Sequence, residues 1–433
     1  MLPVDVLLDS IDRCIPSIIE LVKDIGEHPE LGFREFRTSS LVNDFLRQSG
    51  YTTETNLALT GIKAKLKDDV LRPNIAVIGE LDGIICPESN RADKITGATH
   101  HCGHHLQLGV MMAVAHAFKT TGVASELGGN ISFIAAPAEE YIDLEFRSEL
   151  KQRGEIQYFG GKQELVRRGM FDDIDAAMMV HSQSNTPHPF VGLVEAGNGF
   201  IAEKVKYIGK TAHAAAAPED GINALHAAVL GINAVNAMRE TLRDGNHSRV
   251  HYIMTKGGDA VNSIPADVRL ECFVRSNSID SIRELLEKTN RAFSSGGNAV
   301  GARTEIQSLP GYLPLACNAR LNDLFRTQAE KLIPSDQVRP VTHFNASTDM
   351  GDISHLMPAI HPLVGGVTGA LHAADFEVAD YTAAITIPAK IMTLTLLELL
   401  SNDAEGINSI LKEYKPLLSK QEYLALQNSF FIE

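Results

Sequence analysis

The chain has 433 residues, of which 44% are hydrophobic and 21% are charged, so it is long enough to form two or three domains with buried cores. Its formal net charge of −15 at pH 7 excludes a strongly basic protein that binds nucleic acid or anionic membranes by long-range attraction. No apolar run is long enough for the roughly 18 residues of a membrane-spanning helix, and the acidic start M-L-P-V-D-V-L-L-D is unlike a signal peptide.

The cysteines are few and scattered, which argues against a disulfide framework and predicts a reducing, cytoplasmic location. They are Cys14, Cys86, Cys102, Cys272 and Cys317.

Helical and strand patterns alternate through the first part of the chain. Apolar residues at helical spacing predict the helices, and continuous apolar runs such as N-I-A-V-I-G-E predict buried parallel strands. This alternation predicts a mostly parallel α/β sheet, with ligand-binding groups at the carboxyl ends of its strands. The expected helices are 5–26, 38–49, 106–120 and 161–169, and the expected strands are 61–66, 74–80, 130–137 and a run that ends at His181.

The pattern changes after about residue 190, where the order becomes strand–helix–strand–strand–helix–strand. That order is typical of a ferredoxin-like α+β unit. We therefore expect a domain of residues 193–312 inserted into a larger domain of residues 1–192 and 313–433. The expected elements of the insert are 198–209, 221–243, 249–255, 266–275, 278–298 and 303–309, and the larger domain ends with helices at 380–401 and 404–416.

Residues able to bind a metal gather at five places, and four of these lie at predicted strand ends or in the loops that follow them. Thiolate, imidazole and carboxylate groups are the ligands of zinc, and manganese, cobalt and iron accept the same groups. Each residue alone has a structural explanation, such as an inert buried cysteine or a loop histidine, but their combination favours a metal site. The five places are Glu80–Asp82, the stretch H-H-C-G-H-H at 100–105, Ala138–Glu140, His181 and His372.

Two local patterns sharpen this expectation. Cys102 and His104 are separated by one glycine, which lets the backbone turn tightly so that both side chains reach one ion. Glu139 and Glu140 cannot face the same direction on a strand, so one can bind metal while the other acts as a base.

Seven motifs in a characteristic order make the chain resemble the metal-dependent aminoacylase and carboxypeptidase family. Within that family it is most similar to the amidohydrolase branch of hippurate hydrolases, indoleacetyl-amino-acid hydrolases and aminobenzoyl-glutamate hydrolase. The motifs are H-P-E-L-G-F at 28–33, G-A-T-H-H-C-G-H at 97–104, P-A-E-E at 137–140, M-M-V-H ending at 181, G-K-T-A-H-A-A-A-A-P-E-D-G-I-N-A at 209–224, G-G-D-A-V-N-S-I-P at 257–265 and S-T-D-M-G-D-I-S at 347–354.

The resemblance implies a site with two divalent ions, zinc or manganese with cobalt also possible, that hydrolyses the C–N bond of an N-acyl or N-aroyl amino acid. Glu139 becomes the general base, and His213 of the inserted lid domain stabilises the oxyanion within its own chain or across a homodimer or dimer-based oligomer. Asn262 and Arg275 become contacts to a small carboxylate-bearing substrate. A salt bridge is the structural alternative for Arg275, and burial among apolar neighbours is the alternative for His213. The implied ligands are Cys102, His104, Glu140, His181 and His372.

The chain also departs from that family beside the metal motif. His105 stands where Asp or Asn is usual, His101 where a small residue is usual, Glu80 where many relatives have Asp, and Gly83 where many have Ala. His105 is therefore a candidate substrate-binding residue, while His100 and His101 are either supporting groups or plain loop residues. His105 and Gly83 keep open one alternative, a deaminase of amino-aromatic acids on the same metals. A non-catalytic binding protein is a second alternative, against which the intact ligand set and Glu139 argue.

Overall fold

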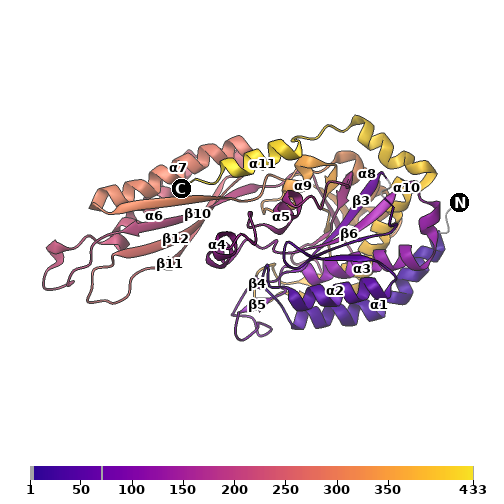
Figure 1. The fold of residues 1–433 in the computed structure, drawn as a ribbon, viewed down its shortest axis with the longest axis horizontal. Coiled ribbons are helices and arrows are strands. Elements are labelled where there is room, and N and C mark those ends of the chain that lie inside the picture. Colours follow the sequence, from indigo (N-terminus) through magenta and orange to yellow (C-terminus); the bar gives the residue numbers. More distant parts are fainter. Residues whose placement is uncertain (1–3, 70–71, 433) are drawn as a thin grey trace. The chain divides into compact units, whose positions relative to one another are not determined.

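A computed structural model describes residues 4–69 and 72–432 as two compact units, each treated by itself below (Figure 1). The first unit comprises residues 1–195, 316–343 and 352–419, and the second comprises residues 196–315, 344–351 and 420–433. The expected boundaries after residues 192 and 312 lie close to two of these junctions. The segments 344–351 and 420–433, expected in the larger domain, instead belong to the second unit.

A six-stranded mixed sheet forms the centre of the first unit. Four neighbouring strands in it run parallel. At one edge, each of the two remaining strands pairs antiparallel with its inner neighbour. Both β3 and β6 are buried at every residue, as expected of central parallel strands covered on both faces. The predicted α/β class is confirmed. In spatial order the strands are β1 Thr53–Leu57, β2 Gly61–Lys65, β6 Asn130–Ala136, β3 Asn74–Glu80, β7 Ala176–Met178 and β15 Ala359–Ile360.

Helices α1, α2 and α3 lie together on one side of β3 and β6 (Figure 1). Helix α3 starts at His104, two residues before the expected start, because Gly103 takes a left-handed conformation with φ of 85° and turns the chain into the helix. The helices of the first unit are α1 Val4–Glu27, α2 Phe36–Gln48, α3 His104–Thr120, α4 Leu144–Gln152, α5 Gly161–Arg167, α8 Ala319–Ala329 and α10 Ile387–Glu413, and α9 Met350–Leu356 begins in the second unit and ends in the first.

Short strands that the sequence did not reveal complete the first unit. They form a four-stranded sheet, in the order β14, β9, β16 and β8, and two small hairpins. Runs of two to four residues are too short to give a periodic signal. Their bounds are β14 Val338–Val341, β9 Val191–Val194, β16 Leu363–Val364, β8 His181–Ser182, β4 Ile84–Ile85, β5 Ala98–Thr99, β17 Val367–Thr368 and β18 Glu377–Val378.

The helix Thr382–Glu413 corrects the expectation that no segment is apolar enough to span a bilayer. By length and composition it is such a segment, but 83% of its most apolar window is buried inside the first unit. The apolar residues of α10 belong to the main hydrophobic core, which is the ordinary place for a helix that is hydrophobic on all sides. Non-helical backbone at Ser401–Ala404 divides the segment into two helices close to the expected break.

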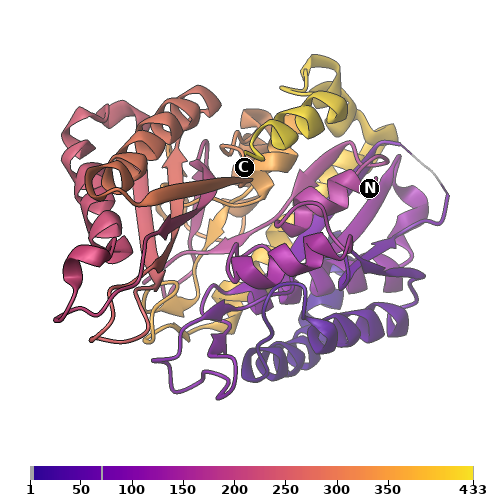
Figure 2. The same ribbon diagram turned by 60° about the vertical axis from the view of Figure 1, so that its left-hand side comes forward.

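An antiparallel four-stranded sheet forms the second unit, with α6 and α7 packed together on it (Figure 2). The spatial order β11–β12–β10–β13 confirms the predicted ferredoxin-like arrangement. Helix α6 starts later than expected, because the Asn223 side chain accepts hydrogen bonds from the first backbone N–H groups and fixes the start at Ala224, and it ends earlier than expected, at Ala237. The elements are β10 Gly199–Ile208, α6 Ala224–Ala237, β11 Arg249–Lys256, β12 Asp267–Ser276, α7 Ile279–Val300 and β13 Arg303–Pro310.

The last helix, α11 Lys420–Ser429, packs with the second unit rather than with the larger domain. Phe430 is 3% exposed and belongs to the core beneath α6 and α7, and the guanidinium of Arg283 lies 5.4 Å from its ring. Ser308 and Ile432 pair through backbone hydrogen bonds. A terminal segment this short carries too little pattern to reveal which core it joins.

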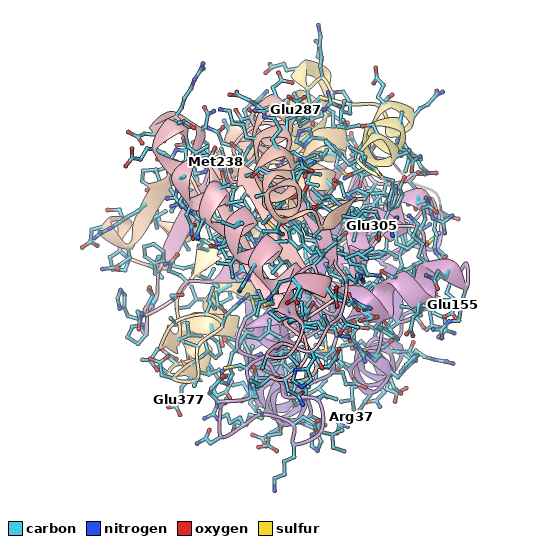
Figure 3. All side chains as sticks on the ribbon, turned by 90° about the vertical axis from the view of Figure 1, so that its left-hand side faces the viewer. Arg37, Glu155, Met238, Glu287, Glu305 and Glu377 are labelled. Atoms are coloured by element: carbon cyan, nitrogen blue, oxygen red, sulfur yellow. The ribbon has the colours of Figure 1, made fainter. Side chains whose placement is uncertain are left out.

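Acidic side chains such as Glu287, Glu305 and Glu377 point into solvent on the surface (Figure 3). This distribution places much of the negative charge where water screens it.

The carboxyl group of Glu203 lies inside the second unit. Glu203 is 0% exposed, and burial raises its pKa to about 8 although the neighbouring Ser308 and Asn290 side chains act to lower it. The folded protein therefore holds this proton at a pH where the unfolded chain, with a pKa of about 4.3, has lost it. The free energy of unfolding should fall as pH rises between these two values.

Glu203→Gln is expected to remove that loss of stability, because a glutamine amide carries no charge and Asn290 Oδ1 can accept from it. The variant's unfolding midpoint minus that of the natural protein should increase steadily from pH 5 to pH 8. Glu305→Gln, at an exposed position on β13, is the control. A midpoint difference that does not change with pH would contradict the assignment.

Candidate metal centre

Three predicted ligands converge at the start of α3. Cys102 lies in the loop before the helix, His104 is its first residue, and His181 begins β8. The sulfur of Cys102 lies 3.4 Å from Nε2 of His181, and one donor atom from each of the three residues falls within 4.8 Å of the others. Thiolate and two imidazoles in this arrangement are a donor set that suits zinc.

The two remaining predicted ligands join the same thiol from its other side. Nε2 of His372 lies 3.3 Å from the sulfur of Cys102 and 3.1 Å from Oε1 of Glu140. Cys102, Glu140 and His372 form a second triad within 4.8 Å. The structure thus brings all five predicted ligands together in two triads that share Cys102.

The ring orientations of His104 and His181 suit metal binding. Nδ1 of His104 lies 2.9 Å from the carbonyl oxygen of Asp82, and Nδ1 of His181 lies 3.0 Å from that of Ser182. Because a carbonyl oxygen only accepts, each Nδ1 donates its hydrogen, and Nε2 is the ring nitrogen that remains for a metal. The donors of this chain therefore fit a divalent metal.

The Cys102 sulfur is a thiolate at neutral pH. Burial raises the pKa of the thiol, as does Glu140, but the imidazoles of three surrounding histidines lower it more, and the net pKa is about 6. A thiolate is the form that binds metal.

A third group of donor atoms comprises Glu80, His104 and Glu139. Nε2 of His104 lies 3.2 Å from Oε2 of Glu80 and 3.8 Å from Oε2 of Glu139. Glu139, the predicted base, is therefore adjacent to the ligand cluster. Glu80 lies in one of the five places that the sequence marks as able to bind a metal, although it is not among the five implied ligands.

Lys162 is a residue that the sequence did not single out. Its Nζ lies 2.5 Å from Oε1 of Glu80, and both side chains are 0% exposed. Burial alone would raise the pKa of Glu80, but Lys162 and His104 lower it more, so the carboxylate stays ionised. Lys162 thus keeps the Glu80 carboxylate negatively charged beside the ligands.

The turn that carries Glu139 and Glu140 is held on both sides by buried charged residues. Ala138 has a φ of 51°, and Glu35 accepts its backbone N–H at 2.8 Å while also accepting the hydroxyl of Thr60 at 2.6 Å. Arg147, 1% exposed, donates to the carbonyl oxygens of Glu140 and Phe159. Glu35 lies two residues after the H-P-E-L-G-F motif at 28–33, so the segment that carries this motif supports the turn.

Glu35→Ala is expected to lower kcat at least tenfold with little change in bound metal, because Ala138 loses the acceptor that holds its unusual backbone conformation. Glu35→Gln should retain most activity, since its amide oxygen can still accept from Ala138 and the Thr60 hydroxyl can turn to accept from its amide. Kinetics and metal analysis of the pair test this. Equal activity losses in both variants would assign the effect to the charge of Glu35 instead.

His361 is a second buried residue that the sequence did not single out. It is 0% exposed, and its ring stacks on that of His181 at a centroid distance of 5.4 Å. It does not belong to any of the three groups of potential metal ligands found among the described residues. Its position suggests that it fixes the plane of the His181 ring.

The predicted residues of the inserted domain are described within the second unit. The exposed His213 accepts backbone N–H groups of Ala215 and Ala216 at Nδ1, so its Nε2 carries the hydrogen and can donate. The backbone carbonyl oxygen of Asn262 accepts a hydrogen bond from the backbone N–H of Ala214 at 3.0 Å and shapes the same loop. Arg275 lies over the rings of Phe200 and Phe273 and donates to Ser347 at 3.2 Å. The roles of all three residues stay predictions.

The side chains of His100, His101 and His105 are not among the three groups of donor atoms. His105 points toward α1, where its ring lies 3.3 Å from the position that a Cβ on Gly26 would take. His101 donates from Nδ1 to the carbonyl of Ala373 at 2.7 Å. The predicted substrate contact of His105 is therefore not among the groups that the structure brings to the candidate metal centre.

Comparisons with known proteins identify several chains that are similar to this one. Residues 196–299 match the model of the peptidase dimerisation domain. The chain is 29% identical to Xaa-Arg dipeptidase of Mus musculus over 77% of this chain and 74% of that protein, and 26% identical to the Homo sapiens enzyme over 96% and 93%. It is 25% identical to one of the subunits of p-aminobenzoyl-glutamate hydrolase of Escherichia coli, over 71% of this chain and 61% of that protein.

A solved structure has the same fold. A Bacillus subtilis protein described as a dinuclear metal binding peptidase from the M20 family superposes with a TM-score of 0.66 and 18% sequence identity, over 90% of this chain and 99% of that one. At this identity the likeness establishes the fold alone.

Proposed function

Because this chain belongs to the M20 peptidase/amidohydrolase family, we propose that it is a dinuclear metal hydrolase that cleaves the amide C–N bond of an N-acyl or N-aroyl amino acid or of a dipeptide. One observation carries the proposal. The two donor triads share Cys102, and Glu139 lies beside them. One shared thiolate between two sets of ligands is the arrangement expected for a pair of ions.

The ligands we propose are Cys102, His104, Glu140, His181 and His372, for zinc or manganese, with cobalt as a further candidate. When bound, two such ions polarise a substrate carbonyl and lower the pKa of a water molecule. Glu80 adds a fixed negative charge next to His104 and strengthens that imidazole as a donor.

Glu139 performs the proton transfers in this proposal. Its carboxylate takes the proton of the attacking water and later delivers it to the leaving nitrogen. The N–H at Nε2 of His213 is a donor suited to a developing oxyanion, and the guanidinium of Arg275 suits a substrate carboxylate. The matches to Xaa-Arg dipeptidase and p-aminobenzoyl-glutamate hydrolase, both named for amide substrates, support an amide substrate here.

A product assay tests the reaction. The metal-loaded protein is incubated with a panel of N-acyl amino acids, N-aroyl amino acids, dipeptides and amino-aromatic acids, and free amino acids and ammonia are both measured. We expect release of a free amino acid from at least one amide. Ammonia as the sole nitrogen product would replace the proposal with a deaminase, and no hydrolysis of any compound would replace it with a binding protein.

The second unit is proposed to form a homodimer, as the peptidase dimerisation domain indicates. β11 lies at the edge of its sheet, and Ile253 on this strand is 60% exposed. Val229 and Leu230 of α6 add apolar surface at 44% and 41% exposed. An uncovered apolar edge strand is a site where a second chain can pair.

Ile253→Lys is expected to shift the dimer toward monomer, because the charge would be desolvated at the paired edge. Sedimentation velocity over a range of concentrations measures the shift. Ile95→Lys, at a residue of the first unit that is 94% exposed, is the control and should leave the assembly unchanged. A natural protein that is monomeric at all concentrations would overturn the dimer.

The free cysteines support a cytoplasmic location for the enzyme.

A further inference from the structure

A pocket in the first unit lies beside the metal-binding loop but excludes the proposed ligands. Its volume is about 550 Å³, within the range of small-molecule sites. Its walls come from α1, from the loop at 90–92, from the histidine stretch and from residues 376–381. Neither the five proposed ligands nor Glu139 line it. The pocket is therefore a compartment separate from the candidate metal centre.

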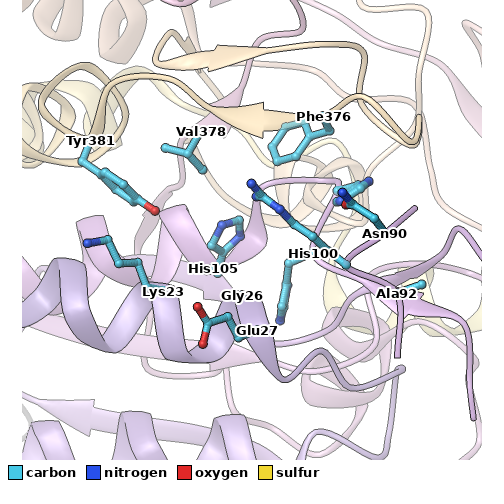
Figure 4. A pocket seen from close by; sticks show the side chains of 12 residues that line it. Lys23, Gly26, Glu27, Asn90, Ala92, His100, His105, Phe376, Val378 and Tyr381 are labelled. Atoms are coloured by element: carbon cyan, nitrogen blue, oxygen red, sulfur yellow. The ribbon is translucent and has the colours of Figure 1, made fainter. Parts of the chain in front are cut away.

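The histidine stretch explains why the two sites are separate. Adjacent residues of a helix point about 100° apart, so His104 faces the metal ligands while His105 faces the pocket. Figure 4 shows the His105 imidazole and the Tyr381 hydroxyl pointing toward each other. His105 Nδ1 is buried without a hydrogen-bond partner among the described residues. His101 is fixed to Ala373, and its ring packs on Phe376 at a centroid distance of 5.5 Å.

Cations outnumber carboxylates among the residues that line the pocket. Lys23 and Arg91 line it against a single carboxylate, Glu27. Each cation forms an ion pair with an exposed carboxylate: Lys23 pairs with Glu20 at 2.9 Å, and Arg91 with Glu377 at 3.3 Å. Exposed ion pairs hold their partners weakly, so both cations can turn to a ligand that enters the pocket.

Flat rings form the apolar part of the wall. The Lys23 ammonium lies 5.6 Å from the centre of the Tyr381 ring, so a positive charge and an aromatic face are adjacent. The rings of His105 and Phe376 complete this surface. Planar side chains offer stacking to a planar ligand.

We propose that this pocket binds a small organic anion with a planar ring, whose carboxylate or phosphate group lies between Lys23 and Arg91 and whose ring packs against Tyr381 and His105. The site is independent of the proposed hydrolysis. It assigns His105 to a second binding site rather than to the substrate of the metal centre.

Fluorescence titration with 2-naphthoate tests the site, because the chain has no tryptophan whose emission would overlap. The metal-loaded protein should bind 2-naphthoate or 2-naphthyl phosphate saturably, and the tighter of the two identifies the preferred acid group. The neutral 2-naphthamide should bind at least tenfold more weakly. The variant Lys23→Gln/Arg91→Gln should lose at least tenfold in affinity for the anion.

Arg47→Gln/Lys412→Gln is the matched control, since it removes the same charge at exposed residues that do not line the pocket. It should bind like the natural protein. The proposal is overturned if no saturable binding occurs, if the amide binds as tightly as the acids, or if the pocket variant loses less than tenfold or no more than the control. If the anion bound at the metal centre alone, the pocket variant would bind it about as well as the control does, and the proposal would be overturned. The test therefore does not depend on whether the protein is a hydrolase.

Discussion

Glu139→Gln is expected to lower kcat about 10²–10⁴-fold, the usual contribution of a general base. Glutamine keeps the size of the side chain but cannot take the proton of the attacking water. Glu139 is not one of the proposed ligands, so the variant should retain its metal. Steady-state kinetics on the substrate found in the product assay, together with metal analysis of the same sample, check both statements.

Glu149→Gln is the control for this substitution, because Glu149 is an exposed carboxylate on α4. It should leave kcat unchanged. Substantial turnover by Glu139→Gln would assign the base to another residue, and Glu80, which also lies next to His104, would be the first to test.

Lys162→Met is expected to destabilise the first unit by about 3–5 kcal/mol, the cost of removing one partner of a buried ion pair. The substitution leaves the Glu80 carboxylate without its partner in an interior where both side chains are 0% exposed. Urea unfolding followed by circular dichroism measures the loss.

The double variant Glu80→Gln/Lys162→Met separates charge from packing. Since it removes both charges, it should recover much of the stability lost in Lys162→Met. A single-variant loss below about 1 kcal/mol, the value of an exposed pair, would contradict a tightly coupled buried pair.

The fold was predictable where hydrophobic patterns are long. The buried runs of β3 and β6 and the periodic apolar residues of α1 each specify their own element. The six elements of the second unit follow from the same local signals. The destination of α11 was not predictable, because a few residues such as Leu426 and Phe430 pack against a core more than a hundred residues away in the chain.

The candidate metal centre was predictable in its donors but not in their support. Cysteine, histidine and glutamate at strand ends are visible in sequence. The contact between Lys162 and Glu80 joins residues 82 positions apart, and that between Glu35 and Ala138 joins residues 103 apart. Neither pair has a motif of its own, and burial makes both of them matter.

The histidine stretch shows the same limit within six residues. Composition marks it as unusual, but only the start of α3 at His104 determines which side chains face the ligands and which face α1. The sequence shows how many histidines the stretch contains but not the direction in which each side chain points.

Metal content per chain, measured by elemental analysis of the natural protein and of Cys102→Ala, tests the central claim most directly. Two triads that share one thiolate predict about two divalent ions per natural chain and a loss of both when the shared sulfur is removed. Cys317→Ala, at a cysteine outside the donor groups, should keep both ions. A natural protein that binds no divalent ion when supplied with zinc, manganese or cobalt, or a Cys102→Ala variant that keeps both ions, would contradict the account.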